Sequence, residues 1–209
     1  MSEGRGGLYK TLAMTRFFDI FFSFLGLILL TPFFIIIAIL LICTSRGGIF
    51  YTQIRVGKQN KDFTLFKFRT MSIDADKEGL LTTGVKDGRI TKLGRFLRKY
   101  KLDELPQLWN VLKGEMSLVG PRPEVRKYVD LYSDAQKHIL EVRPGITDYA
   151  SIEYRDESNI LAQFDNPEKQ YIEEIMQKKL LLNLRYIENR SLKEYFRVLI
   201  LTLRSVVFG

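Results

Sequence analysis

The charge-free segment of residues 20–45 constrains the fold of this chain most. It lies between Asp19 and Arg46 and consists mainly of Phe, Leu and Ile. A helix of about 20 apolar residues crosses the hydrocarbon core of a bilayer. The segment is too long for a secretory signal peptide and lacks a small-residue cleavage site. A buried core helix is the alternative, but an uninterrupted run of this length suits lipid better. We therefore expect a membrane anchor at 1–46 and a second domain at 47–209.

The pair Thr31-Pro32 in the middle of this segment predicts how the helix inserts. Proline lacks a backbone N–H and clashes with the preceding turn, so the helix should kink there. Basic residues flank the segment on both sides: Lys10, Arg16, Arg46, Arg55 and Lys58. The positive-inside rule then places both ends in the cytoplasm. We expect a re-entrant helical hairpin broken at Thr31-Pro32, in which the hydroxyl of Ser23 or of Thr31 satisfies some of the freed carbonyls. A straight span is the alternative.

The remainder of the chain predicts an α+β, mainly helical fold. Residues 49–56 and 63–71 are typical of two strands, with 57–62 as the turn of a small β-hairpin. We expect a helix over the cation-rich segment 91–100, and start or stop signals predict further helices over 103–113, 133–141 and 166–188. The apolar C-terminal segment 195–204 carries Arg197 and Arg204 seven positions apart. This segment fits an amphipathic helix in the membrane interface, and an ordinary core helix fits equally well.

Composition narrows the chemistry. The net charge of +8 favours anionic partners, and there is one cysteine, Cys43, and one histidine, His138. A multi-histidine metal site is therefore impossible, and any catalysis must rely on carboxylates, cations and an oxygen-ligated metal. The cations of 86–101 come without a stacking-aromatic pattern, so no nucleic acid is expected. Anionic lipid or a phosphorylated substrate is the better partner.

The adjacent carboxylates Asp103 and Glu104 follow a basic run and precede Pro106, which is tolerated in the first turn of a helix. A helix N-terminus and nearby cations both favour an ionised aspartate. Such a carboxylate serves as a metal ligand, a nucleophile, or both. The alternative is an N-cap Asp with a first-turn Glu. A second acidic pair, at Asp74 and Asp76, is expected to be solvated.

Four further cations are candidates for binding an anion. Prolines on both sides fix the backbone of Arg122, and Arg143 precedes a Pro-Gly turn. An arginine held in this way suits bidentate phosphate recognition. Lys67 and Arg69 share one face of the second predicted strand. Two cations on one strand face are usually solvent-exposed, but here they are also candidates for an anion site.

These motifs, in this order, resemble a known family. They are Phe-Lys-Phe-Arg-Thr-Met at 66–71, Asp-Glu-Leu-Pro-Gln-Leu-Trp-Asn at 103–110, Lys-Gly-Glu-Met-Ser-Leu-Val-Gly-Pro-Arg-Pro at 113–123, and Arg-Pro-Gly-Ile-Thr at 143–147. With the proline-broken apolar segment, the chain from about residue 14 to 203 resembles the bacterial sugar transferases, specifically the small monotopic phosphoglycosyl transferases.

The resemblance implies transfer of a sugar-1-phosphate from a UDP-sugar to polyprenol phosphate, at the cytoplasmic face of the bacterial inner membrane. By carry-over Asp103 is the nucleophile that forms a phosphosugar–aspartyl intermediate. Glu104 lies beside it as metal ligand or proton acceptor, and Mg²⁺ is the expected cofactor, held by Asp103 and Glu104. The substrate-binding cations would be Lys67, Arg69, Arg98, Arg122 and Arg143. The sequence leaves the oligomeric state open, a homodimer included.

One segment departs from the family pattern. Many members continue the Arg-Pro-Gly-Ile-Thr motif with Gly-Trp-Ala-Gln, whereas this chain has a different run at 148–157. The departure leaves the identity of the sugar open. Two other functions also remain: a non-enzymatic membrane adaptor, and a phosphotransferase that modifies phospholipids. An adaptor would not require a pair of adjacent carboxylates together with proline-fixed arginines. A phospholipid-modifying phosphotransferase would take a lipid head-group donor instead of a nucleotide sugar.

The re-entrant topology is testable by labelling. In a background without Cys43, single cysteines introduced near Met1 and Ser45 should both react with a membrane-impermeant reagent from the cytoplasmic side. Positive charge at both ends of the apolar segment is the reason for this expectation. Reaction of the two positions from opposite sides of the membrane would reject the hairpin.

Overall fold

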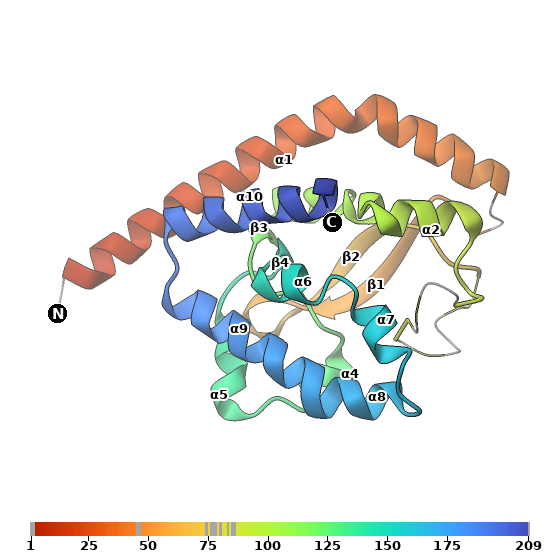
Figure 1. Ribbon diagram of the computed structural model, residues 1–209. Coiled ribbons are helices and arrows are strands. Elements are labelled where there is room, and N and C mark those ends of the chain that lie inside the picture. Colours follow the sequence, from red (N-terminus) through yellow and green to blue (C-terminus); the bar gives the residue numbers. More distant parts are fainter. Residues whose placement is uncertain are drawn as a thin grey trace.

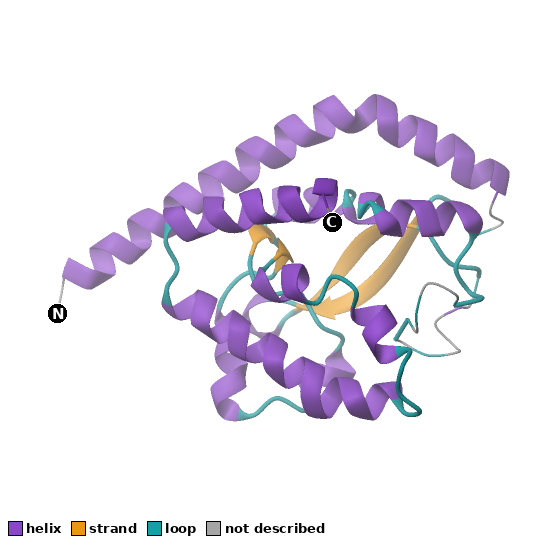
Figure 2. Ribbon diagram, in the orientation of Figure 1, coloured by secondary structure: helices purple, strands orange, loops and turns teal. Residues whose placement is uncertain are grey.

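The computed structural model describes residues 3–44, 47–73, 75, 79, 81–82, 84 and 87–208, with side chains from residue 10 onward. The protein is mainly helical and carries two small sheets of two strands each. Figure 1 and Figure 2 show a long, bent N-terminal helix lying across one side of a compact body that contains both sheets. The predicted α+β, mainly helical class is confirmed.

The apolar segment lies within one helix, α1 (Glu3–Thr44), which contains Pro32. Figure 1 shows α1 bending near its middle, so that both of its halves incline toward the body. Thr31 donates from Oγ1 to the Leu27 carbonyl over 2.7 Å, a bond to the preceding turn that bends helices. Ser23 does not take the predicted role, because its buried hydroxyl has no hydrogen-bond partner among the described residues. In the described part of the chain, α1 is the one helix long and apolar enough to cross a membrane.

The predicted β-hairpin is confirmed by strands β1 (Phe50–Val56) and β2 (Asp62–Phe68). They pair antiparallel, with Phe50 opposite Phe68 and Val56 opposite Asp62. A short 3-10 turn, η1 (Lys58–Asn60), joins them. β2 ends three residues earlier than expected, because after Phe68 the chain leaves the ladder and Met71 forms an isolated bridge with Ile90.

A second sheet was not expected from the sequence. Strands β3 (Ser117–Val119) and β4 (Gly145–Thr147) pair in parallel. They are too short to carry a recognisable alternation of apolar and polar residues. A Cβ on Gly145 would lie 2.1 Å from the backbone nitrogen of Gly120, so only glycine permits this approach. Gly120 of the Gly-Pro-Arg-Pro motif and Gly145 of the Arg-Pro-Gly motif thus allow the two backbones to come into direct contact.

The helices largely follow the predicted signals. α2 (Lys92–Lys99) begins after the N-cap Thr91, and the capping box of Ser133 and Gln136 opens α5 (Asp134–Lys137), which continues as η4 (His138–Glu141). Asn166 caps α8 (Pro167–Gln170), which runs through the π-helical turn η5 (Tyr171–Ile175) into α9 (Met176–Glu188). Three short helices had no sequence signal that we recognised: α4 (Arg126–Val129), α6 (Tyr149–Glu153) and α7 (Glu157–Leu161).

The helix predicted over 103–113 needs a correction at its start. Residues Leu102–Glu104 form a separate 3-10 turn, η3, and α3 begins only at Gln107 and ends at Lys113. Lys101 adopts a left-handed conformation (φ 56°) before η3, which turns the chain away from α2. Gly114, also left-handed (φ 85°), ends α3 as predicted.

The C-terminal segment forms one helix, α10 (Leu192–Phe208), which is buried near its beginning and partly exposed farther along. Tyr195 and Val198 near its beginning are fully buried in the core. Farther along, Ile200, Leu203 and Val207 are 51%, 65% and 68% exposed. The helix therefore packs in the core over its first turns and then presents an apolar face.

A buried carboxylate on α1 attaches the membrane helix to the body. Asp19 Oδ1 accepts hydrogen bonds from Ser117 Oγ (3.0 Å), the Leu118 backbone nitrogen (2.9 Å) and the Tyr195 hydroxyl (2.9 Å). One turn earlier, Arg16 donates to two carbonyls at the end of α3. The second half of α1 packs its buried Ile37 and Leu41 into a cluster with Phe68 and Leu97. Both halves of α1 are therefore fixed to the body.

Replacing Asp19 with Ala should destabilise the protein by about 3 kcal/mol, because it leaves several buried donors without an acceptor. In a domain of this size that lowers the melting temperature by about 6–12 °C. Thermal unfolding of the detergent-solubilised chain measures the effect. Asp62→Ala is the matched control, because the Asp62 side chain is 47% exposed in its pair with Arg126 and its loss should cost less than about 1 kcal/mol. Equal melting temperatures for the two variants would contradict the role of Asp19.

Candidate active site

Asp103 and Glu104 lie in η3, between the basic helix α2 and helix α3. Both are buried, with 5% and 8% of their surface exposed. The left-handed Lys101 and Pro106 bound this turn, and the Glu104 backbone nitrogen closes it by donating to the Lys101 carbonyl. The two neighbouring carboxylates have different surroundings.

Glu104 is paired with two cations from distant parts of the chain. Arg122 contacts both of its oxygens through its two terminal nitrogens, and Lys67 Nζ lies 2.9 Å from Oε1. Burial by itself raises the pKa of Glu104, but Arg122 and Lys67 outweigh it and hold the pKa well below its ordinary value. Glu104 in turn raises the pKa of Arg122. The glutamate is therefore ionised and its charge is neutralised inside the protein.

Asp103 has no such pairing. Its Oδ1 is buried and has no hydrogen-bond partner in the part of the chain that the structure describes. Burial and then the charge of Glu104 raise the pKa of Asp103, while Lys67, Arg98 and Lys101 act in the opposite direction. The cations therefore favour the ionised form of Asp103, as expected, but burial and the adjacent Glu104 oppose them and leave the pKa above its ordinary value.

This donor set suits a Mg²⁺ ion that is held mainly by its substrate. Mg²⁺ prefers oxygen ligands and is commonly bound by one or two carboxylates together with substrate phosphates. Asp103 Oδ1 is buried and has no hydrogen-bond partner among the described residues, so it is available to a metal ion. Both oxygens of Glu104, in contrast, already contact cations. Among the described residues no three carboxylate, histidine or cysteine side chains are arranged so that they could hold a metal ion together. Asp103 is therefore the better of the two predicted ligands.

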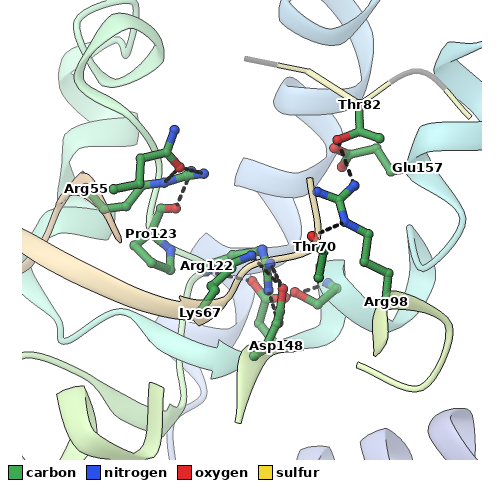
Figure 3. Close-up of polar contacts among 12 residues, drawn as sticks. Arg55, Lys67, Thr70, Thr82, Arg98, Arg122, Pro123, Asp148 and Glu157 are labelled. Atoms are coloured by element: carbon green, nitrogen blue, oxygen red, sulfur yellow. Dashed lines mark hydrogen bonds and ion pairs between the residues drawn. The ribbon is translucent and has the colours of Figure 1, made fainter. Parts of the chain in front are cut away.

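Asp148 positions Arg122. It is 1% exposed, and its Oδ2 accepts a hydrogen bond from the Arg122 backbone nitrogen over 3.1 Å. Its Oδ1 accepts from the Ser151 backbone nitrogen and so caps α6. Figure 3 shows Arg122 directly above Asp148, with Lys67 alongside. Sequence reasoning missed this role, although an aspartate before a helical segment is an N-cap signal.

A cavity of about 160 Å³ opens between the β-hairpin, the segment that follows it and α2, and its walls are rich in cations. Three of these cations, Lys67, Arg69 and Arg98, were predicted to bind substrate. Arg55 and Arg89 were not among the predicted substrate-binding residues. Arg89 is paired with Asp87, whereas Arg69 donates to the Phe50 carbonyl. Such a cavity suits an anionic ligand of several phosphates.

Arg98 is fixed in this cavity by two hydroxyls. Its Nε donates to Thr70 Oγ1 over 2.9 Å and its Nη1 to Thr82 Oγ1 over 3.1 Å, as Figure 3 shows. Burial lowers the pKa of Arg98, and the nearby acidic residues counteract this. A Cβ on Gly94 would lie 2.0 Å from the Thr70 carbonyl oxygen. Glycine at this position therefore lets α2 approach Thr70 and brings Arg98 into the cavity.

Arg143 is the predicted site residue that the structure does not bring together with the others. Its Nε donates to the Gly114 carbonyl over 2.9 Å, at the end of α3. It lines a different cavity, near the first half of α1. The acidic residues Asp74 and Asp76, which were expected to be solvated, lie outside the described residues.

Comparison with known proteins identifies the class. The family model described as bacterial sugar transferase matches residues 10–209. The chain therefore belongs to the bacterial sugar transferase family, as its motifs indicated.

Several curated proteins are similar over most of this chain. An uncharacterized sugar transferase from Bacillus subtilis, EpsL, is 37% identical over 93% of this chain and 87% of its own length. The UDP-glucose:undecaprenyl-phosphate glucose-1-phosphate transferase of Klebsiella pneumoniae is 37% identical over 90% of this chain. The UDP-N-acetylgalactosamine-undecaprenyl-phosphate N-acetylgalactosaminephosphotransferase of Aeromonas hydrophila is 40% identical over 66% of this chain. The matched regions cover only 38% and 33% of the latter two proteins.

The two carboxylates should respond oppositely to removal of their charge. At pH 7 Glu104→Gln should destabilise the protein by about 3 kcal/mol, because Arg122 and Lys67 lose a buried counter-charge. Asp103→Asn should raise the melting temperature by a few degrees, because it removes a buried charge that Glu104 disfavours.

The pH dependence follows from the depressed pKa of Glu104. Its stabilisation is fully present above the ordinary glutamate pKa of 4.5 and is lost as the pH falls through the lower folded pKa. The difference in melting temperature between the unmodified chain and Glu104→Gln should therefore shrink below about pH 4.5. Thermal unfolding from about pH 2.5 to about pH 8, which extends well below the ordinary glutamate pKa, measures it. A difference that does not change with pH would rule out this pairing as its source.

Proposed function

We propose that this chain transfers a sugar-1-phosphate from a UDP-sugar to undecaprenyl phosphate and that the reaction passes through a phosphosugar–aspartyl intermediate on Asp103. The observation that carries the proposal is the unequal environment of the two carboxylates. Glu104 is neutralised by Arg122 and Lys67, whereas Asp103 keeps a buried oxygen without a hydrogen-bond partner among the described residues. The names of the Klebsiella and Aeromonas relatives support the same reaction class.

In the first step a carboxylate oxygen of Asp103 attacks the β-phosphorus of the donor. A bond forms between that oxygen and phosphorus, the bond from phosphorus to the bridging oxygen breaks, and UMP leaves with the electron pair. In the second step a phosphate oxygen of the lipid acceptor attacks the same phosphorus and displaces the carboxylate. The products are a polyprenyl diphosphate sugar and free Asp103, ready for another cycle.

The residues around Asp103 reduce the charge repulsion of the first step. A carboxylate and a diphosphate are both anions, so their approach is slow unless fixed cations compensate the charge. Lys67, Arg69 and Arg98 line the cavity in which we place the diphosphate, and Lys67 also contacts Glu104. Bound Mg²⁺ would supply further charge neutralisation at the phosphate oxygens, with Asp103 as its first protein ligand and Glu104 as the second.

Helix α1 provides the reason for membrane attachment. Both halves of α1 are fixed to the body, while Phe17, Leu29 and Ile42 on its outer side are 63%, 67% and 63% exposed. A lipid phosphate is confined to the membrane surface, and a catalytic domain fixed at that surface meets it without a search in three dimensions. We place the catalytic domain on the cytoplasmic face of the bacterial inner membrane, with α1 inserted as a re-entrant helix.

Incubation of the purified chain with Mg²⁺ and a panel of UDP-sugars, without acceptor lipid, tests the covalent step. We expect release of one equivalent of UMP and a gain in intact protein mass equal to one phosphosugar. Asp103→Asn should abolish both, because an amide is a poor nucleophile. Chelation of Mg²⁺ should slow the release at least about 100-fold, since the loss of several kcal/mol of charge neutralisation has that effect.

Asp130→Asn is a suitable matched control, because it makes the same chemical change at an exposed position at the end of α4. It should keep full UMP release. Full activity of Asp103→Asn would end the covalent mechanism. Release of UMP only after polyprenol phosphate is added, without any change in protein mass, would favour direct transfer between the two substrates.

A further inference from the structure

A second cavity, of about 100 Å³, lies where the first half of α1 meets β3 and the junction between α9 and α10. In Figure 1 this junction lies at the opposite end of the body from α2 and the loop beside it. Among the described residues, none lines both this cavity and the one that contains Lys67 and Arg98. The second cavity is therefore separate from the candidate active site.

The walls of this cavity carry an excess of positive charge. Four cations line it: Arg16, Lys58, Arg143 and Arg190. The carboxylates in its walls are Asp19 and Glu141. Asp19 Oδ1 is enclosed by three donors, and Glu141 lies 2.9 Å from His138 Nδ1. In the described part of the chain neither carboxylate forms an ion pair with one of the four cations. Four cations thus face two carboxylates, and the walls keep an excess of positive charge.

Several arginine donors in this cavity remain available to a ligand. Arg16 and Arg143 each use part of their guanidinium to bind carbonyls at the end of α3. Arg190 Nε is buried and has no hydrogen-bond partner among the residues that the structure describes. Burial lowers the pKa of Arg190. A planar guanidinium with open donors matches the geometry of a phosphate group.

The surroundings indicate where such a phosphate comes from. On α1, beside the cavity, Leu12, Met14, Phe17 and Ile20 are 37%, 47%, 63% and 45% exposed. This apolar surface begins at the level of the cavity and continues into the charge-free segment of α1. The cavity therefore lies where the lipid-facing surface of the helix starts, which is the depth of lipid head groups. Basic pockets beside membrane helices attract anionic head groups.

We propose that this cavity binds the phosphate of an anionic membrane phospholipid, with Arg190 and Lys58 as head-group ligands and Arg16 and Arg143 completing the positive wall. The bound lipid is neither donor nor acceptor in the transfer reaction. It neutralises the buried arginines and fixes the first half of α1 at the membrane surface. This site would make the chain selective for membranes that contain anionic lipid.

Native mass spectrometry of the full detergent-solubilised chain tests the proposal, with dioleoylphosphatidylglycerol as the probe and dioleoylphosphatidylcholine as the zwitterionic comparison. We expect one phosphatidylglycerol to be retained in preference to phosphatidylcholine. The double variant Lys58→Gln and Arg190→Gln should weaken its binding at least about tenfold, since each loses a charge-assisted contact. Arg190→Lys keeps the charge and should retain intermediate binding, which distinguishes loss of the site from loss of folding.

The matched control is the double variant Lys169→Gln and Lys178→Gln. It also removes two positive charges, but from side chains that are 66% and 55% exposed. It should bind phosphatidylglycerol like the unmodified chain. Equal weakening in both double variants would overturn the proposal, because net charge alone would then explain binding. Binding of inorganic phosphate that depends on Arg190, without retention of phosphatidylglycerol, would overturn the lipid assignment and indicate a site for a soluble anion.

Discussion

The buried carboxylate of Glu104 determines how the candidate active site is assembled. It lies in η3, yet its partners Lys67 and Arg122 come from β2 and from the loop after β3. A buried charge without partners is strongly unfavourable, so folding must bring all three segments together. Once this happens the negative charge of Glu104 is compensated by Lys67 and Arg122, whereas the adjacent Asp103, which we propose as the nucleophile, keeps an oxygen without a hydrogen-bond partner among the described residues. The site thus separates the role of holding cations from the role proposed for chemistry.

A second buried carboxylate, Asp19, does the same for the membrane helix. Its three donors come from β3 and α10, so α1 is an integral part of the fold and no flexible tether. The end of α1 that Asp19 fixes also borders the cavity proposed for a lipid head group. Burial of one carboxylate therefore fixes the position of the body relative to α1, the helix that we propose to be inserted in the bilayer.

Local signals account for the elements that the sequence predicted correctly. Three helices are capped through contacts within three residues, by Thr91, Ser133 and Asn166. Such contacts can be predicted from the sequence without knowledge of the tertiary structure. The parallel sheet of β3 and β4 had no such signal, because three-residue strands are specified by the close approach of Gly120 and Gly145, which are distant in the sequence.

By itself the sequence determined the long apolar helix, the β-hairpin, the family, and the choice of Asp103 and Glu104 as central carboxylates. These follow from composition and from motifs that are contiguous in the chain. Only the tertiary structure decided which carboxylate is neutralised, that Arg122 joins the site while Arg143 does not, and that burial raises the pKa of Asp103. The physical reason is that pairing and desolvation depend on which segments meet in space, and neither is encoded in the spacing of residues along the chain.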